Sequence, residues 1–505
     1  MRLLRRNALG VYAVYAAAIV SGLLVTPIVI HSIGTPAFGI WTFIGAVTIY
    51  LSVLDFGVAP SIIRFAAEAR GRGADEDLNA VASTGLVVYA LIGLLTLPVG
   101  VGLAFVVPAA VGAPHDLVWD ARIATLFVVA SLAIRFPLGL FNNLLIAQQR
   151  WDVSNLANLA STILYAALVA ILIPRWGGLV LLGALTFGAT ALRLVLPLFW
   201  LRKELPGLRI ARQYVTRARL RQLASFSSSN FLVHIAQKIV FSTDVIVVGI
   251  VLGSAASGIY AVPAKLFALA FGLGTAATSL MFPAFAELEG AEDRDRQRRL
   301  LFAGLRGGMA LMLVLALPLL AIPDLLIQAW IGSGFHSSYA VMAILAGVLL
   351  VHQPIFVVTQ FLIARGRQRA IAIVSIAVTV ANLGLSFLLA HLVGLWGVAV
   401  STLVTDLVML AVVLPWIVAP AAETTTLALL RSILRPFAPV LAAAAVVLVG
   451  LARWWSPHTL LSLAVLGAIW LVIAGGAIWR FGLAAGERAQ FGREFWQRRP
   501  VTADL

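Results

Sequence analysis

The sequence predicts an all-α membrane protein with about fourteen transmembrane helices. Of its 505 residues, 61% are hydrophobic and only 11% are charged, whereas soluble domains usually contain about a quarter charged residues. A helix needs roughly 20 mainly apolar residues to cross a bilayer, so the chain has room for a dozen or more spans. Most Arg and Lys residues also lie in alternate connections between the apolar runs. These observations exclude a soluble globular fold.

Charged residues, glycines and prolines divide the chain into fourteen apolar runs. The first run, from Ala8 to Ile33, is longer than the roughly 7–15 residues of a cleavable signal sequence, so we expect it to remain as the first helix. The fourteen candidate helices lie near residues 8–33, 38–66, 80–108, 118–147, 153–174, 178–201, 224–252, 256–285, 304–331, 339–364, 369–391, 395–418, 435–453 and 458–481.

The distribution of basic residues predicts the orientation of these helices. With a cytoplasmic N-terminus, 29 of the 36 basic residues fall in loops and tails on the cytoplasmic side, and only Arg175 and Arg453 fall in opposite loops. Because Arg and Lys are enriched in cytoplasmic loops, we expect both termini in the cytoplasm and the chain in a bacterial inner membrane. The same rule explains the net charge of +15 without a nucleic-acid partner.

The chain contains an internal repeat. Residues 33–41, IGTPAFGIW, match residues 252–260, LGSAASGIY, and four further short matches follow in order at offsets of 217 to 220. A steady offset of this kind indicates two copies of one structural unit. Two parallel six-helix bundles are typical of transporters, with the substrate between them. The predicted domains are a bundle at 1–201, a basic linker at 202–223, a second bundle at 224–418, helices 13 and 14 at 435–481, and a basic tail at 482–505.

The linker at 202–223 contains seven basic residues. Such a segment can lie along the anionic leaflet as a surface helix. A solvated linker is the alternative.

Polar residues of the seventh candidate helix share one face. Asn230, His234, Gln237 and Asp244 are spaced four, three and seven residues apart, with Lys238 at the edge of the stripe. Hydrogen bonding between helices is one explanation, but it accounts poorly for a stripe through the full membrane thickness that includes opposite charges. We therefore expect this face to line a wet cavity.

Three other helices contribute polar residues at membrane depth. In helix 10, His352 and Gln353 occupy the repeat position that corresponds to Arg135 of helix 4. The predicted substrate-binding residues on these helices are Arg135 and Asn142 in helix 4, Lys265 in helix 8, and His352 and Gln353 in helix 10.

Three acidic residues within the spans are candidates for ion coupling. They are Asp55, Asp244 and Asp406. Asp406 could bind a proton or a sodium ion, and a structural hydrogen-bonded acid is the alternative for this residue. Lys265 and Asp244 could also neutralise each other. Arg64, on the same candidate helix as Asp55, is a candidate for substrate entry or gating.

The predicted cavity is cationic. Arg135, Lys238 and Lys265 supply guanidinium and ammonium groups, which bind phosphate strongly where water is scarce. A diphosphate head group linked to sugar therefore fits this cavity better than a cationic drug does.

Common catalytic motifs are absent from the sequence. None of the three lysines follows a glycine, so there is no phosphate-binding P-loop, and no two histidines stand four residues apart as in zinc proteases. The chain has no cysteine, which removes thiolate metal sites and cysteine nucleophiles. We expect no enzymatic activity, no metal and no cofactor.

Four segments resemble a known family: GTPAFGIW at 34–41, LDFGVAPSIIRFAAEARG at 54–71, TDVIVVGIVLGSAASGIYAVPAKLF at 243–267, and FPAFAEL at 282–288. With these segments the chain resembles the polysaccharide and O-antigen flippases of the multidrug/oligosaccharidyl-lipid/polysaccharide (MOP, MATE-related) exporter superfamily. The resemblance implies a V-shaped pair of six-helix lobes and alternating access. It also implies that an undecaprenyl-diphosphate-linked oligosaccharide is moved between leaflets for surface polysaccharide or lipopolysaccharide synthesis.

The same resemblance implies the partners. Besides the lipid-linked oligosaccharide and membrane lipids, these are a polysaccharide polymerase and glycosyltransferases. Related lipid flippases use two additional C-terminal helices to form a groove for the polyprenyl tail, a role that helices 13 and 14 could fill.

Two other functions remain open from the sequence. A cation-coupled multidrug exporter on the same scaffold would prefer a cavity dominated by acids and aromatic residues. A membrane glycosyltransferase or polymerase would need ionisable groups presented in sizeable loops, and the outer connections here are short.

Overall fold

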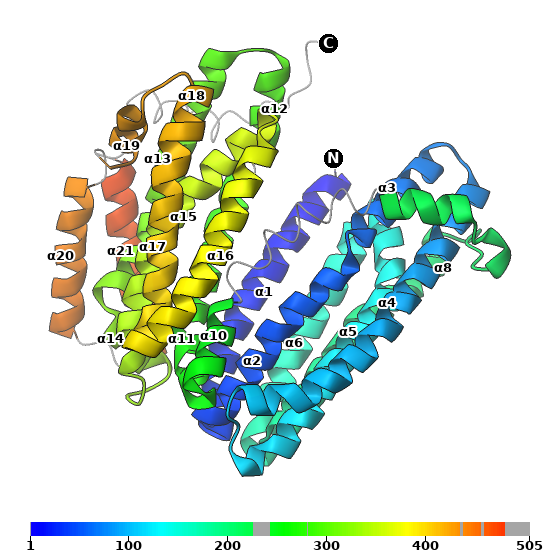
Figure 1. The fold of residues 1–505 in the computed structure, drawn as a ribbon, viewed down its shortest axis with the longest axis horizontal. Coiled ribbons are helices and arrows are strands. Elements are labelled where there is room, and N and C mark those ends of the chain that lie inside the picture. Colours follow the sequence, from blue (N-terminus) through cyan, green and yellow to red (C-terminus); the bar gives the residue numbers. More distant parts are fainter. Residues whose placement is uncertain (1, 226–242, 280, 435–437, 456–458, 480–505) are drawn as a thin grey trace. The chain divides into compact units, whose positions relative to one another are not determined.

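The computed structural model describes residues 2–225, 243–279, 281–434, 438–455 and 459–479. Within these ranges all regular elements are helices and no strand occurs, which confirms the predicted all-α class. The chain divides into two compact units, coloured along the sequence in Figure 1. Unit 1 comprises 1–261 and 386–398, and unit 2 comprises 262–385 and 399–505. The predicted boundary in the linker at 202–223 stays a prediction.

The helices of unit 1 come mainly from the first half of the chain. They are α1 Arg2–Ile33, α2 Thr35–Leu51, η1 Ser52–Asp55, α3 Val58–Gly71, α4 Asp75–Ala110, η2 His115–Leu117, α5 Val118–Ala147, α6 Trp151–Trp176, α7 Leu179–Val195, α8 Leu198–Glu204, η3 Arg212–Tyr214, a helix at 217–225, and α10 Thr243–Leu252.

The helices of unit 2 follow, and α11 and α16 have residues in both units. They are α11 Ser254–Ser279, α12 Met281–Gly290, α13 Arg294–Ala321, α14 Pro323–Trp330, α15 Ser337–Ala364, α16 Gln368–Val393, α17 Leu395–Val413, η4 Leu414–Val418, α18 Ala419–Ala421, α19 Thr426–Leu434, α20 Ala438–Trp455 and α21 Leu460–Ala477.

The described residues contain eleven helices that are long and apolar enough to cross a membrane. The chain is therefore a multi-pass membrane protein. Shorter apolar helices at Thr243–Leu252, Ala445–Trp455 and Leu461–Ala477 fall on the predicted spans 7, 13 and 14. The count of fourteen stays a prediction, because residues 226–242 of the seventh span lie outside the described ranges.

The second predicted span, expected as one helix over 38–66, is interrupted. The α-helix ends at Leu51, a single 3₁₀ turn follows, and α3 starts at Val58. Phe56 and Gly57 between them have φ angles of 48° and 77°, which lie in the left-handed region that a helix cannot contain. The expectation of a continuous helix was wrong, because Gly57 adopts a left-handed φ angle at little energetic cost and so allows the helix to break here.

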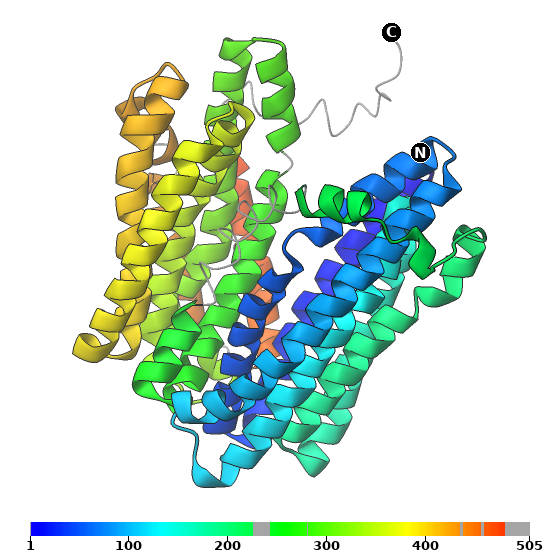
Figure 2. The same cartoon turned by 45° about the vertical axis from the view of Figure 1, so that its right-hand side comes forward.

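In unit 1, α4 lies along α5, α5 along α7, and α1 along α6. The long helices of this unit can be followed in Figure 2. Ile62, Phe65 and Leu140 are buried in a cluster where α3, α4 and α5 meet. This packing fixes the helices that surround the pocket described below.

The two copies of the repeat cross each other within unit 1. A Cβ on Gly39 would collide with the backbone carbonyl of Ser254, and a Cβ on Gly258 would collide with that of Thr35. The contact is reciprocal, because both pairs are related by the repeat offset of 219. Small residues let membrane helices approach this closely. The crossing explains why the start of α11 packs with unit 1.

The basic linker docks onto unit 1. Leu205 and Leu223 are buried, and the backbone N–H of Arg209 donates to Oδ1 of Asn79 at 2.7 Å. Arg219 pairs with Asp77 at the start of α4. The segment is helical only in part, so it is neither the continuous surface helix nor the free solvated linker that we expected.

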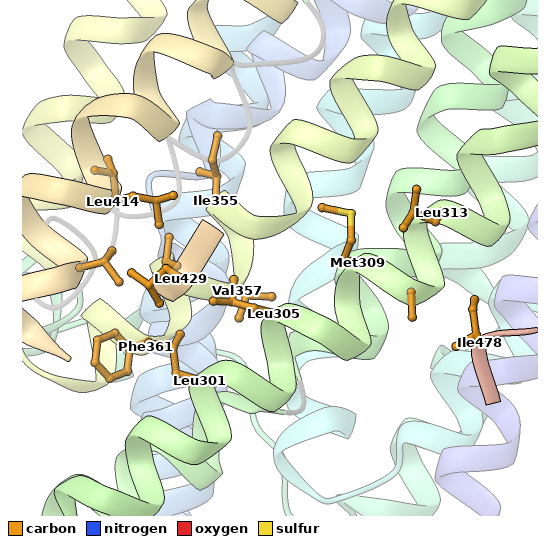
Figure 3. Packing of buried hydrophobic residues seen from close by; sticks show 14 of the residues in the cluster. Leu301, Leu305, Met309, Leu313, Ile355, Val357, Phe361, Leu414, Leu429 and Ile478 are labelled. Atoms are coloured by element: carbon orange, nitrogen blue, oxygen red, sulfur yellow. The ribbon is translucent and has the colours of Figure 1, made fainter. Parts of the chain in front are cut away.

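Unit 2 has a large apolar core between α13 and α15 (Figure 3). Leu305 and Met309 on α13 belong to this core with Val357 and Phe361 on α15. The helices α20 and α21 also pack on α13. Helices 13 and 14 of the prediction are thus part of the packed structure of unit 2.

Candidate functional site

A pocket of about 380 Å³ lies inside unit 1, among η1, α3, α4, α5, α6 and α7. Most of its walls are polar side chains from helices that are apolar elsewhere. The lining residues are Ser52, Asp55, Ala59, Tyr89, Leu132, Arg135, Phe136, Gly139, Asn142, Asn143, Ser154, Asn158, Arg193 and Leu194.

Two arginines dominate the charge of this pocket. Arg135 lies in the second half of α5 and Arg193 near the end of α7. Neither guanidinium forms a hydrogen bond or ion pair with another residue in the described ranges, and their like charges repel each other. An uncompensated charge within a spanning helix costs at least about 2.5 kcal/mol. Such a pair of cations favours a bound anion.

Asp55 is the single acid among the lining residues. It sits at the interruption between α2 and α3, which frees its side chain from a regular helix face. The hydroxyl of Tyr89 donates to Oδ1 of Asp55 at 2.8 Å, and Nδ2 of Asn143 donates to that hydroxyl oxygen at 3.3 Å. Interrupted helices often form binding sites in transporters. Here the interruption places an acid in the same pocket as two arginines.

One face of α5 forms much of the pocket wall. Arg135, Gly139 and Asn142 follow one another at spacings of four and three residues, which places them on the same side of the helix. Asn158 and Ser154 on α6 add further amide and hydroxyl groups. Side chains of this kind both donate and accept hydrogen bonds, as sugar hydroxyls require.

The pocket brings together three of the predicted residues: Arg135, Asn142 and Asp55. Arg64 is not among its lining residues and forms a 2.8 Å ion pair with Glu68, one turn further along α3. The other predicted residues described by the structure lie elsewhere.

Asp244 lies at the start of α10 in unit 1 and is 5% exposed. The hydroxyl of Tyr260 donates to its Oδ2 at 2.8 Å. The neighbouring Thr243 hydrogen-bonds with Tyr50. Asp244 therefore resembles Asp55 in having a tyrosine as a donor.

Three predicted residues lie in unit 2. Nδ1 of His352 is 2.8 Å from Oδ2 of Asp406, so the acid that showed no obvious partner in the sequence has one in the fold. Gln353 is 1% exposed and packs between Gly274 and Gly308. Lys265 lies on α11, and its pairing with Asp244 stays a prediction because the two residues belong to different units.

The remaining predicted residues of the seventh helix cannot be placed. Asn230, His234, Gln237 and Lys238 lie outside the described residues. Their role in a cavity stays a prediction. Among the residues that the structure does describe, no group of three His, Asp or Glu side chains is arranged to hold a metal ion.

Sequence reasoning missed Arg193, Tyr89 and Asn158. A signal existed for Arg193, because it is the only charged residue in the apolar run at 178–201, and ionisable groups in spans usually face a protein interior. Asn158 shares a helix face with Ser154 and Ser161, at spacings of four and three residues, which was a second signal. Tyr89 gave no comparable signal.

Comparison with protein families matches residues 4–289 to the family described as polysaccharide biosynthesis protein. The chain belongs to this family. A relative is the uncharacterized membrane protein EpsK of Bacillus subtilis (strain 168), which is 27% identical over 405 residues, covering 77% of this chain and 78% of EpsK.

Solved structures share the fold of this family member. The lipid II flippase MurJ in an inward closed conformation aligns with a TM-score of 0.71 at 13% identity, over 94% of this chain and 98% of MurJ. An inward-facing multidrug resistance MATE family transporter of the MOP superfamily aligns with a TM-score of 0.63 at 16% identity, over 83% and 95% of the two chains. The predicted polysaccharide biosynthesis family is thus confirmed, and the chain shares its fold with a transporter of the MOP superfamily.

Proposed function

We propose that this protein moves an undecaprenyl-diphosphate-linked oligosaccharide from the cytoplasmic to the outer leaflet of a bacterial inner membrane. The movement serves the synthesis of a surface polysaccharide. Membership of the polysaccharide biosynthesis family and a fold like that of a lipid flippase support the proposal. The observation on which it rests is the pocket of unit 1, with Arg135 and Arg193 in its wall.

The two guanidinium groups bind the diphosphate. Arginine offers several N–H donors in a planar arrangement that matches phosphate oxygens, and such charge-assisted bonds are about twice as strong as neutral ones. The pocket volume of about 380 Å³ lies within the usual range of ligand sites. It accommodates a head group, while a polyprenyl tail stays in the surrounding lipid.

The neutral polar wall contacts the sugar next to the diphosphate. Asn142, Asn158 and Ser154 provide both donors and acceptors for its hydroxyl groups. Asp55 keeps the empty pocket from holding two uncompensated cations, and it repels the phosphates toward the arginines when cargo is bound.

Translocation follows alternating access between two parallel repeats, with both termini in the cytoplasm. A cation gradient or the membrane potential provides the energy, and Asp55, Asp244 and Asp406 are the candidate coupling residues. A cationic drug is a poor cargo for the pocket of unit 1, because two positive charges face one negative charge there.

Substitution of the two arginines tests this function. In a strain that lacks the chromosomal gene, we expect the Arg135→Ala/Arg193→Ala variant to lose export of the surface glycan, measured by surface polysaccharide staining. The matched control is Arg122→Ala on the same helix α5, because Arg122 stacks on Phe105 and lies outside the pocket. Full export by the double variant at normal protein level contradicts the proposal.

A binding measurement separates the head-group site from transport. Purified protein in lipid nanodiscs is titrated with undecaprenyl-diphosphate-N-acetylglucosamine. Because a hydrogen bond to a charged group contributes about 1.5–3 kcal/mol, each single arginine variant should weaken binding by roughly tenfold to a hundredfold.

A further inference from the structure

His352 and Asp406 meet near the middle of two long helices of unit 2. His352 lies midway along α15, and Asp406 lies near the middle of the candidate span Leu395–Ala421. Since about 20 residues cross the hydrocarbon core, both side chains belong to the depth at which water is scarcest. Their contact, 2.8 Å between Nδ1 and Oδ2, joins α15 to α17.

The surroundings of this pair are apolar. The side chains of His352 and Asp406 are 14% and 6% exposed. The ring of Phe271 on α11 packs edge-on against the imidazole, with 5.3 Å between ring centroids. Ile355 and Met409, one turn along from each residue, belong to the large apolar core of unit 2.

The helices around the pair have few charged residues between their ends. Helix α11 contributes Lys265 and α13 contributes Arg306, whereas α16 has none between Arg369 and His391. The short helices α12 and α14, which pack on α15, contribute Glu287, Glu289 and Asp324. The hydrogen bond next to Asp406 in the chain is between neutral groups: Asn382 on α16 donates to the hydroxyl of Thr405, the residue before Asp406.

Imidazole next to carboxylate has two protonation states near neutral pH. With the imidazole protonated the pair is neutral overall, and with the imidazole neutral it has a charge of −1. Histidine is the one side chain whose ordinary pKa allows this change under physiological conditions. An apolar environment penalises the state with net charge, so gain and loss of the proton are linked to closure and opening of the site toward water.

The other two candidate coupling acids, Asp55 and Asp244, do not contact a histidine in the described structure. Asp55 and Asp244 accept hydrogen bonds from Tyr89 and Tyr260, and a phenol does not ordinarily lose its proton near neutral pH. Asp55 also shares a pocket with two permanently charged arginines.

The repeat relates this pair to the anion pocket. At an offset of 217, Pro137 corresponds to Pro354 and Arg135 corresponds to His352. One repeat therefore has a permanent cation at this position, and the other has a titratable cation with an acid beside it. A permanent charge suits the binding of an anion, and a titratable charge suits the binding of a proton.

We propose that His352 and Asp406 form the proton-binding site that couples cargo movement to the proton gradient, which rests on the proposed function. The pair takes up one proton from water on the outer side and releases it to water on the cytoplasmic side. Cargo moves in the opposite direction, and the proton is neither consumed nor produced. Acid outside therefore accelerates outward movement of cargo.

Everted membrane vesicles, whose lumen corresponds to the outer side, test this coupling. The probe is fluorescent undecaprenyl-diphosphate-N-acetylglucosamine added outside, and its protection from a membrane-impermeant quencher reports translocation. For one coupled proton, a lumen more acidic by one pH unit should change the final leaflet ratio of the wild-type protein by up to about tenfold. His352→Asn and Asp406→Asn should abolish this response.

Two controls make the result specific. His352→Asn keeps a polar atom at the position of Nδ1 but cannot accept the proton. His391→Gln changes a histidine near the end of α16 that contacts the carbonyl of Phe387, and it should respond to the gradient like the wild type. A gradient response retained in His352→Asn, or absent from an active wild-type protein, overturns the proposal.

A measurement without cargo distinguishes this proposal from the proposed function. In protein with ¹⁵N-labelled histidine, the signal lost in His352→Asn should change when the pH is changed, and it should shift in Asp406→Asn. A signal that does not change with pH refutes proton binding, even if the arginine pocket binds its lipid. Loss of probe binding in the arginine variants tests the head-group site alone.

Discussion

Asp55 and Tyr89 of unit 1 have no chemical counterparts in unit 2. At the repeat offset of 219 they correspond to Gly274 and Gly308. The side chain of Gln353 lies against these two glycines, and a Cβ would come within 3.0 Å of Oε1 at the first and 2.8 Å of Nε2 at the second. One repeat has a hydrogen-bonded acid at this place, and the other has a buried neutral amide. Among the described residues, the acid and the tyrosine of the pocket thus occur in unit 1 and not at the matching positions of unit 2.

The bond between Tyr89 and Asp55 gives a testable prediction. Tyr89 is 2% exposed, so Tyr89→Phe should keep the packing and lose the donated hydrogen bond. We expect the free energy of unfolding to fall by about 1.5–3 kcal/mol, measured by thermal unfolding of purified protein in nanodiscs. In the Asp55→Ala background the same substitution should have a smaller effect, because only the bond from Asn143 is then left to lose. Additive effects of the two substitutions contradict this coupling.

Site residues could be predicted from the sequence where their spacing within one helix placed them on a common face. The face of α5 with Arg135 and Asn142 followed from helical spacing, and the structure places both residues in one pocket. The partner of Asp406 was not predicted, because His352 is 54 positions away in sequence and the contact depends on how α15 packs with α17. Arg193 was overlooked, although Thr186 and Thr190 precede it on one face of its helix at spacings of four and three residues.

At the scale of elements, the interruption at Phe56 and Gly57 shows a second limit. The segment 38–66 is apolar enough for one continuous helix, and Gly57 alone does not specify a break. The left-handed φ angles at both residues become favourable only when Asp55 can reach Tyr89 on another helix. Helix existence was thus predictable from composition, whereas this discontinuity depends on tertiary contacts.

The crossing of α2 and α11 gives a prediction at the same scale. A side chain at Gly39 would overlap the carbonyl oxygen of Ser254, and overpacking of this kind costs about 1–3 kcal/mol. We expect Gly39→Ala to lower the unfolding temperature and to reduce glycan export. Gly45→Ala, on the same helix and with no neighbour within 4 Å, should leave both unchanged. Equal behaviour of the two variants contradicts the importance of the crossing.

At the scale of the whole molecule, the two repeats share a frame and differ in chemistry. Helix α13 begins 219 residues after the start of α4, and α15 begins 219 residues after the start of α5. Within this common frame, unit 1 has a pocket with two arginines in its wall, and unit 2 has a histidine paired with an acid. Under the proposed function, divergence of the two repeats separates cargo binding from energy coupling.

The helices α20 and α21 lie outside the repeat but inside the packing of unit 2. Leu466, Trp470 and Ala474 are buried in its core, and Nε1 of Trp470 donates to the backbone carbonyl of Val314 on α13 at 2.8 Å. Because α13 is a central helix of unit 2, these two helices should stabilise the unit, whether or not they also contact a lipid tail.

Trp470→Ala tests this contribution. Loss of a buried Trp side chain costs about 3–5 kcal/mol, and the lost hydrogen bond leaves the Val314 carbonyl without this donor. We expect a lower unfolding temperature for purified protein and less folded protein in the membrane. The control is Trp454→Ala on α20, because Trp454 is 87% exposed. If both variants unfold at the wild-type temperature, α21 contributes little to the stability of unit 2.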